Sequence, residues 1–343
     1  MCDSAPERDC PSTRRRLLKV TGAAAIAAAI APNARGGEPQ PSPATKPANR
    51  PNGRIQIGIL LGTFARPTLE ARLDAAKACG IACAQLSMDC AALPAMPDAI
   101  PPELIERSRR EFAAREIAIA SLQGTFNMSH PDAQQRQAGL RRLKVLADAC
   151  KGLGTSKIHL CTGTRDRQNM WRRHADNDSP QAWRDMVDCM GKAVEIAEEA
   201  QVLLAFEPEV NNVVDSAKKA RRLLDEIRSK CLKVTIDPAN IFHAGELPHM
   251  ARMLDEAFEL LGKDIALAHA KDLDHDGDAG HLAAGKGRLD YDRYLRLLAS
   301  CGFDGPLLLH GLSETQAPGC VAFLREKLAR LTPKSSSPDA RPM

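Results

Sequence analysis

The chain has 343 residues, of which 44% are hydrophobic and 26% charged, a composition typical of a soluble globular protein. Its formal net charge is +4, but the surplus of basic residues lies in the first 54 positions, and the rest of the chain is close to neutral. A domain without a basic surplus is poorly suited to nucleic acid, because neutralisation of phosphates dominates affinity there. We therefore expect no nucleic-acid partner, and the length allows one large α/β domain or two small ones.

The beginning of the chain has the pattern of an export signal. Residues 12–19 read STRRRLLK, and residues 20–31 are apolar and small. Such a stretch, about a dozen residues long, is typical of a secretory signal and too short to span a membrane. Arg14 and Arg15 resemble the arginine pair of the twin-arginine signal. We predict a signal peptide over residues 1–31, a periplasmic mature protein and no membrane association of that form; if the leader is an inert basic tail, the protein is cytoplasmic.

Two further segments lack the apolar residues of a folded domain. Residues 32–54 are rich in Pro, Gly, Asn and Ala, which predicts a disordered linker. Residues 332–343 predict a disordered tail. The nine cysteines that follow the leader show no C-x-x-C spacing and are odd in number. We interpret them as small buried hydrophobic residues, with one or two disulfides left open.

From residue 55 onward, apolar β-type segments alternate with helical ones. The eight β-type segments are 55–61, 81–86, 117–122, 157–161, 202–206, 233–236, 265–268 and 306–309. Helical spacing of apolar residues follows them, for example at 140–153, 183–200 and 291–301. This alternation predicts a single (β/α)8 TIM barrel over residues 55–331. A doubly wound open sheet is the alternative, but GTFA at 62–65 is not the glycine-rich turn that such a sheet uses to hold a nucleotide.

Four consecutive predicted strands end in side chains that suit a metal ion. Glu207 follows the fifth, Asp237 the sixth, His269 the seventh and His310 the eighth. In such a barrel the carboxyl ends of the strands form the active-site face. Mixed carboxylate and imidazole donors favour a divalent Mn, Zn, Co or Fe ion. Singly, each residue has a structural explanation, such as capping of the turn at Pro238 by Asp237; together they predict a metal site.

The sequence around these residues resembles a known family. The segments FEPE (206–209), TIDPAN (235–240), AHAKD (268–272) and GFDGPLLLHGL (302–312) look like the xylose isomerase-like TIM barrels. That superfamily includes sugar phosphate isomerases and epimerases, inosose dehydratases and an apurinic-site endonuclease. The resemblance covers roughly residues 54–331.

The resemblance also implies residue roles. In the ketose epimerases of this superfamily a Glu, an Asp, a His and a second Glu from the last four strands bind the metal, and the two glutamates move the proton. Glu207, Asp237 and His269 match this pattern. His310 stands where the second Glu would be, so Glu209 or Glu314 would have to serve as a second acid or base.

Several further residues are candidates for substrate binding. Asn240 stands where the epimerases often place a substrate-binding His, and Lys271 follows the seventh strand. The loop 162–178 is long enough to form a lid over the barrel mouth, and it contributes Arg165, Trp171 and His174.

An acidic run after the seventh strand imitates another kind of site. Asp272, Asp274, Asp276 and Gly277 have the spacing of the start of an EF-hand loop, but its twelfth position is Ala283 rather than Glu. Without that bidentate ligand we interpret the run as a solvated acidic loop.

These observations predict a metal-dependent isomerase or epimerase of a keto sugar or sugar derivative. A carboxylate, with Glu207 as the first candidate, would remove the proton next to a carbonyl group. Three alternatives remain open: a lyase or dehydratase on the same kind of substrate, a metal-dependent phosphodiesterase like the endonuclease branch, and a non-catalytic sugar-binding barrel. The expected partner is a small carbohydrate, and homo-oligomerisation is left open.

Overall fold

The computed structural model describes residues 55–331; the predicted signal peptide (1–31), linker (32–54) and tail (332–343) lie outside this part of the chain. Eight parallel strands form its centre: β1 (Gln56–Leu60), β2 (Cys83–Leu86), β3 (Ala118–Gln123), β4 (Lys157–Cys161), β5 (Leu203–Glu207), β6 (Leu232–Ile236), β7 (Ile265–Asp272) and β9 (Pro306–Leu309). They pair in chain order, and the pairing of β6 with β7 and of β9 with β1 closes the ring. The predicted (β/α)8 barrel is confirmed, and each of the eight strands overlaps its predicted segment.

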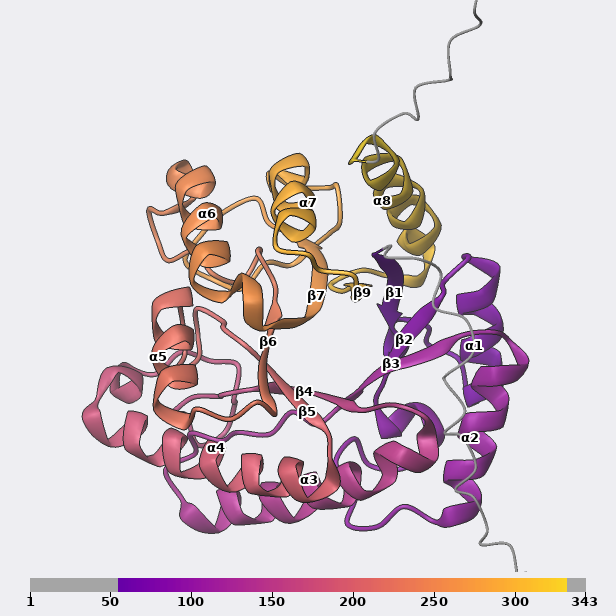
Figure 1. The fold of residues 1–343 in the computed structure, drawn as a ribbon, viewed down its shortest axis with the longest axis horizontal. Coiled ribbons are helices and arrows are strands. Elements are labelled where there is room, and N and C mark those ends of the chain that lie inside the picture. Colours follow the sequence, from indigo (N-terminus) through magenta and orange to yellow (C-terminus); the bar gives the residue numbers. More distant parts are fainter. Residues whose placement is uncertain (1–54, 332–343) are drawn as a thin grey trace, which may run out of the picture. The chain divides into compact units, whose positions relative to one another are not determined.

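The helices surround this ring of strands (Figure 1). They are α1 (Leu69–Ala78), α2 (Pro102–Ala114), α3 (Ala133–Leu153), α4 (Pro180–Ala200), α5 (Ala217–Ile227), α6 (Met250–Leu261), α7 (Tyr291–Ser300) and α8 (Ala317–Leu331). Several begin at a side chain that accepts a hydrogen bond from a first-turn N–H, as Thr68, Asp132 and Ser216 do. The helices predicted at 183–200 and 291–301 match α4 and α7 closely, whereas α3 begins well before residue 140 because Asp132 caps it.

The barrel requires a glycine where it closes. Gly58 lies in β1 between Cys83 of β2 and Leu308 of β9, its partners in the two neighbouring strands. A Cβ atom on Gly58 would lie 2.6 Å from the backbone oxygen of Cys83 and 2.5 Å from Leu308 Cδ2. A side chain at this position would therefore force the first and last strands of the ring apart.

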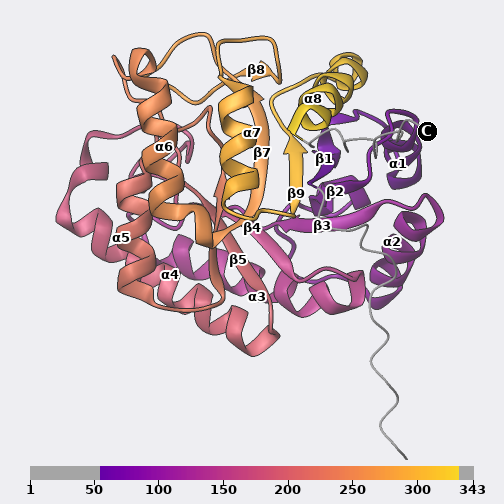
Figure 2. The same ribbon diagram turned by 45° about the horizontal axis from the view of Figure 1, so that its top comes forward.

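One strand differs from its prediction. β7 continues beyond residue 268 to Asp272, so His269 and Lys271 lie within the strand rather than after it. Its last two residues pair with a short antiparallel strand, β8 (Leu282–Ala283), which Figure 2 shows beside β7. The Asp272 carboxylate accepts hydrogen bonds from the backbone N–H groups of Leu273, Gly285 and Leu289. These contacts hold the returning chain against β7, and the seventh segment therefore ends later than its apolar run.

Two further features of the barrel bear on the sequence predictions. All nine cysteines between residues 55 and 331 are free, and six of them are buried, as interpreted from their context. Within the same range, no helix combines the length and the apolar character needed to cross a membrane.

A buried carboxylate links the loops that follow β5 and β6. Asp215 Oδ2 lies 2.8 Å from Lys219 Nζ and 3.6 Å from Arg173 Nη1, and Asp215 Oδ1 lies 3.8 Å from His243 Nε2. Burial alone would raise the pKa of Asp215, but His243 and Lys219 lower it to about 2. A carboxyl whose pKa is depressed by folding stabilises the folded state at all pH values above its unfolded pKa. This cluster therefore stabilises the barrel at neutral pH.

Candidate metal centre

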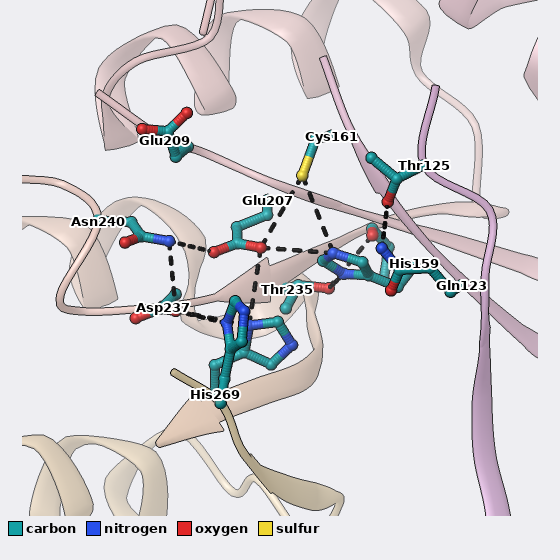
Figure 3. Close-up of polar contacts among 12 residues, drawn as sticks. Gln123, Thr125, His159, Cys161, Glu207, Glu209, Thr235, Asp237, Asn240 and His269 are labelled. Carbon is teal, nitrogen blue, oxygen red and sulfur yellow. Dashed lines mark hydrogen bonds and ion pairs between the residues drawn. The ribbon is translucent and has the colours of Figure 1, made fainter. Parts of the chain in front are cut away.

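Four neighbouring strands bring the predicted metal ligands together. Glu207 is the last residue of β5, Asp237 follows β6, His269 lies in β7 and His310 follows β9. His269 Nδ1 lies 3.6 Å from Glu207 Oε2 and 3.5 Å from Asp237 Oδ2. His310 Nδ1 lies 3.6 Å from the same Asp237 oxygen. Figure 3 shows Glu207, Asp237 and His269 pointing toward one another.

The spacing of these atoms fits a metal ion. Donors held about 2.1 Å from one ion at the corners of a tetrahedron lie roughly 3.4 Å from one another. The three separations between carboxylate and imidazole atoms are all close to that value. Both ring nitrogens of His269 and Nδ1 of His310 are buried without a hydrogen-bond partner among the described residues. Leaving a buried polar atom unpaired costs about 1–3 kcal/mol, so these residues fit a bound cation better than an empty core.

The electrostatics of the cluster also favour positive charge. Burial alone would lower the pKa of His269, but the charges of Glu207 and Asp237 raise it to about 9. Burial would likewise raise the pKa of Asp237, but Lys271 and His269 hold it well below its usual range. Burial would also raise the pKa of Glu207, but it is lowered, chiefly by His269, so both buried carboxylates keep their charge through neighbouring positive charge, which a bound metal ion would likewise supply.

Two predicted substrate-binding residues lie against this cluster. Asn240 Nδ2 donates a hydrogen bond of 2.6 Å to Glu207 Oε1 and a longer one, of 3.3 Å, to Asp237 Oδ2. Lys271 Nζ donates a hydrogen bond of 3.0 Å to Asn240 Oδ1. Asn240 thus fixes the orientation of Glu207, and Lys271 fixes that of Asn240.

A histidine that the sequence analysis missed supports Glu207 from the other side. His159 lies in the middle of β4, and its Nε2 atom is 3.4 Å from Glu207 Oε2. Its Nδ1 atom is 3.0 Å from Thr235 Oγ1. The Thr235 hydroxyl donates its own hydrogen to the backbone oxygen of Ala205, so His159 Nδ1–H must donate to Thr235. The Cys161 thiol lies 3.9 Å from His159 Nε2.

This tautomer leaves His159 Nε2 without a proton and facing the centre. Burial lowers the pKa of His159 to about 3, so the ring is neutral. His159, Glu207 and His269 each offer a donor atom within 4.8 Å of the others, as do Asp237, His269 and His310. His159 is therefore a further candidate ligand. The one sequence signal was a polar residue inside an apolar strand, two positions before the strand ends.

The two predicted stand-ins for a second acid or base are placed differently. Glu209 is buried, and its Oε1 atom accepts a hydrogen bond of 2.9 Å from the Asn211 N–H. Burial raises the pKa of Glu209 to about 7, with a smaller contribution from Glu207. Figure 3 shows its side chain lying apart from the Glu207 carboxylate. Glu314 lies in the 3-10 helix Glu314–Gln316 and forms an ion pair with Arg66 near the surface.

Between residues 55 and 331, no described contact joins the predicted lid residues to the metal cluster. Arg165 Nη1 lies 2.7 Å from Asp185 Oδ2 of α4 and donates to the Ser129 backbone oxygen, contacts that anchor its own loop. Trp171 is 49% exposed, and His174 caps a short 3-10 helix. Their roles in substrate binding remain predictions.

Comparison with known proteins agrees with this architecture. A family model described as xylose isomerase-like TIM barrel matches residues 73–327. Comparison of the sequence with curated proteins found no match. Among solved structures, 3-keto-D-glucoside 4-epimerase from E. coli has a TM-score of 0.62 at 15% identity, covering 80% of this chain and 100% of its own.

Two other solved structures are similar to a comparable extent. D-allulose 3-epimerase from Methylomonas sp., in complex with D-allulose, has a TM-score of 0.57 at 12% identity, with 80% of this chain and 98% of its own covered. The IOLI protein with a bound zinc atom has a TM-score of 0.63 at 15% identity, with 82% and 100% covered. At such identities the structural likeness shows a shared fold.

Proposed function

This chain belongs to the xylose isomerase-like TIM barrel family, and on that premise we propose that it is a metal-dependent isomerase or epimerase of a keto sugar or sugar derivative. The observation that carries the proposal is the set of buried imidazole nitrogens on His269 and His310, which lack hydrogen-bond partners within the described barrel and face the carboxylates of Glu207 and Asp237. The similar structures that act on a 3-keto-glucoside and on D-allulose support the substrate class.

The proposed centre consists of Glu207, Asp237, His269 and His310, with His159 as a further candidate. A divalent ion bound there supplies positive charge, which stabilises negative charge that develops on substrate oxygens. The ion is Mn²⁺, Zn²⁺, Co²⁺ or Fe²⁺, because imidazole and carboxylate donors together suit these ions. The similar structure that contains zinc supports one member of this set.

Glu207 is the proposed base. Its carboxylate takes the proton from the carbon next to the carbonyl group. Return to the neighbouring carbon, with transfer of the hydroxyl proton, gives an isomer; an epimer forms when a second acid on the opposite face delivers a proton to the same carbon while Glu207 keeps the one it removed. The hydrogen bond from Asn240 Nδ2 to Glu207 Oε1 keeps the carboxylate oriented during this exchange. Lys271 and Asn240 provide charged and polar groups that can hold substrate oxygens beside it.

A polar wall next to the centre supports a substrate with several hydroxyl groups. Gln85 of β2 and Gln123 of β3 are hydrogen-bonded to each other through their amides. Gln123 Nε2 also donates to Thr125 Oγ1 at 2.8 Å, and Ser121 donates to Gln85 Oε1 at 3.0 Å. Figure 3 shows Gln123 and Thr125 on the same side of the barrel as His159. Side-chain amides and hydroxyls can exchange these contacts for hydrogen bonds to sugar hydroxyls.

One observation favours a second candidate, a lyase that eliminates water after the same proton abstraction. His310 stands where the ketose epimerases have a second glutamate, and its Nδ1 lies 3.6 Å from Asp237 Oδ2. Elimination needs one base on carbon and one proton donor for the leaving hydroxyl, whereas epimerisation by two glutamates needs a base on each face of the substrate. With His310 in place of the second glutamate, Glu207 supplies the single base of an elimination but not the pair that such an epimerisation uses.

Product analysis distinguishes the two reactions. The metal-loaded protein is incubated with ketoses, ketose phosphates and 3-keto-glycosides, and the products are separated and identified by NMR. An isomerase or epimerase gives products of unchanged mass, and a lyase gives products that have lost water. If no compound of this panel is converted while the metal is in place, the proposal is wrong in its substrate class or its reaction.

A further inference from the structure

The acidic run after β7 does not form the calcium loop that its spacing imitates. Asp272 accepts three backbone N–H groups at the end of its strand. Asp276 Oδ2 accepts the Leu247 N–H at 2.7 Å, and Asp278 Oδ1 accepts from Asn211 Nδ2 at 2.6 Å. These carboxylates hold the loop against neighbouring loops instead of converging on one point, as ligands of a calcium ion would.

A different group of side chains does converge in this loop. Asp274 Oδ1 is hydrogen-bonded to His275 Nδ1 and lies 3.5 Å from His281 Nε2. The two imidazole rings are tilted by 43°, with centroids 5.0 Å apart. The three donor atoms all lie within 4.8 Å of one another, and all three side chains are about half exposed. One carboxylate and two imidazoles thus occupy one corner of the loop.

We propose that Asp274, His275 and His281 form a second divalent-metal site, separate from the buried centre. Two imidazoles and a carboxylate are the ligand set of many three-ligand zinc sites, which leave the fourth position to water. The same donors bind Cu²⁺, Ni²⁺ and Co²⁺, whereas Ca²⁺ and Mg²⁺ prefer oxygen ligands. Because the side chains are exposed, rotating them by the small amount that a tetrahedral site requires displaces no packed neighbour.

The position of this site gives it a structural consequence. Its ligands come from both ends of the segment 274–281, so a bound ion closes that segment into a ring. Within the segment, the Gly277 N–H donates to the Phe242 oxygen at 3.0 Å, and the Gly280 N–H lies 2.9 Å from the Ala239 oxygen. The Gly280 N–H also donates to Asn240 Oδ1 at 3.0 Å. A bound ion would therefore hold closed a loop that contacts Asn240, the residue that orients Glu207.

Zinc titration of the untagged full-length chain tests the proposal. After equilibrium dialysis against zinc and elemental analysis, wild type should retain two ions per chain and the His275→Ala/His281→Ala variant one. His281→Gln alone should lower the affinity for the second zinc ion by more than roughly tenfold. Removing a residue that only orients a metal ligand already costs about that much, and His281 is a proposed ligand itself. His174→Ala is the matched control and should leave both ions in place, because His174 Nδ1 lies 3.7 Å from Asp176 Oδ2, a comparable exposed pair without a second imidazole.

The Asp237→Ala variant keeps the two sites distinguishable. It should retain one zinc ion, and its combination with the two loop substitutions should retain none. Equal zinc content in wild type and in the double loop variant would overturn the second site. If the double loop variant loses one ion while Asp237→Ala still holds two, the loop site stands and the buried centre is contradicted.

Hydrogen exchange provides the second readout. In wild type, zinc should slow exchange of the amides of residues 274–281 beyond the level of the protein without zinc, since opening the loop then requires loss of the ion. The double loop variant should show no such slowing, although its circular dichroism spectrum stays unchanged. Equal slowing in both proteins would show that an ion at this site does not hold the loop closed.

Discussion

The hydrogen bond between His159 and Thr235 offers a quantitative test of how the centre is supported. Thr235→Val removes the hydroxyl that accepts from His159 Nδ1–H at 3.0 Å, while the shape of the side chain is nearly preserved. Both residues are buried, so no water replaces the lost acceptor. An unpaired buried donor costs about 1–3 kcal/mol of unfolding free energy. In a domain of this size each kcal/mol lowers the melting temperature by about 2–4 °C.

Thr235→Ser is the matched control. It keeps the hydroxyl and loses one methyl group, which costs about 0.8 kcal/mol of burial and a further contribution from the small cavity. We expect Thr235→Val to have the lower melting temperature of the two in calorimetry at one scan rate. We also expect Thr235→Val to weaken metal binding by roughly 10–100-fold, since a partner that orients a ligand usually contributes this much.

The opposite ranking would refute the reasoning. If Thr235→Val is as stable as wild type while Thr235→Ser is less stable, the methyl group matters at this position and the hydroxyl does not. The Nδ1–H tautomer of His159 would then lose its basis, and with it the placement of a bare Nε2 atom beside Glu207.

Three further predictions concern other parts of the chain. Asp237→Ala and His269→Ala should each remove most of the metal from the buried centre, and elemental analysis showing full occupancy of that centre in both variants would exclude these ligands. Asp215→Asn should cost about 2 kcal/mol of unfolding free energy at neutral pH, because the pKa of Asp215 falls from 3.8 to about 2 on folding. This stabilisation is present above the unfolded pKa and is lost as the pH falls from 4 to 2, so a difference between variant and wild type that is constant with pH in urea unfolding would contradict it. Changing Arg14 and Arg15 together to Lys should keep the full-length protein in the cytoplasm, whereas equal distribution of both forms would show that the leader is inert.

The strand-end residues could be predicted because local sequence marks where a strand stops. Pro238 cannot donate to a strand ladder, so the residue pair Asp237-Pro238 by itself places the carboxylate at the rim of the barrel. The same logic places Glu207, which precedes Pro208. It works because parallel strands in a closed ring all run toward one face, so residues at or near the ends of four separate strands meet without any knowledge of their packing.

The remaining parts of the centre depend on contacts between distant segments. His159 lies inside an apolar strand, and only the pairing of β4 with β5 and of β5 with β6 shows that it reaches Glu207 and Thr235. The full length of β7 depends on N–H groups of residues 285 and 289 that bind Asp272. Asp274 and His281 likewise meet only through the turn between them. The spacing of residues along the sequence does not predict such turns.

The proposed function depends on one step, in which a carboxylate at this metal centre removes a proton next to a carbonyl group. Deuterium incorporation tests it most directly, because a proton held on a carboxylate exchanges with solvent even when turnover is slow. Metal-loaded protein in deuterated water should introduce deuterium next to the carbonyl of at least one ketose, ketose phosphate or 3-keto-glycoside. Glu207→Gln, assayed with metal in excess, should abolish the incorporation. Incorporation that persists in Glu207→Gln would contradict the role of Glu207, and absence of both incorporation and product across the panel would contradict the proposed reaction.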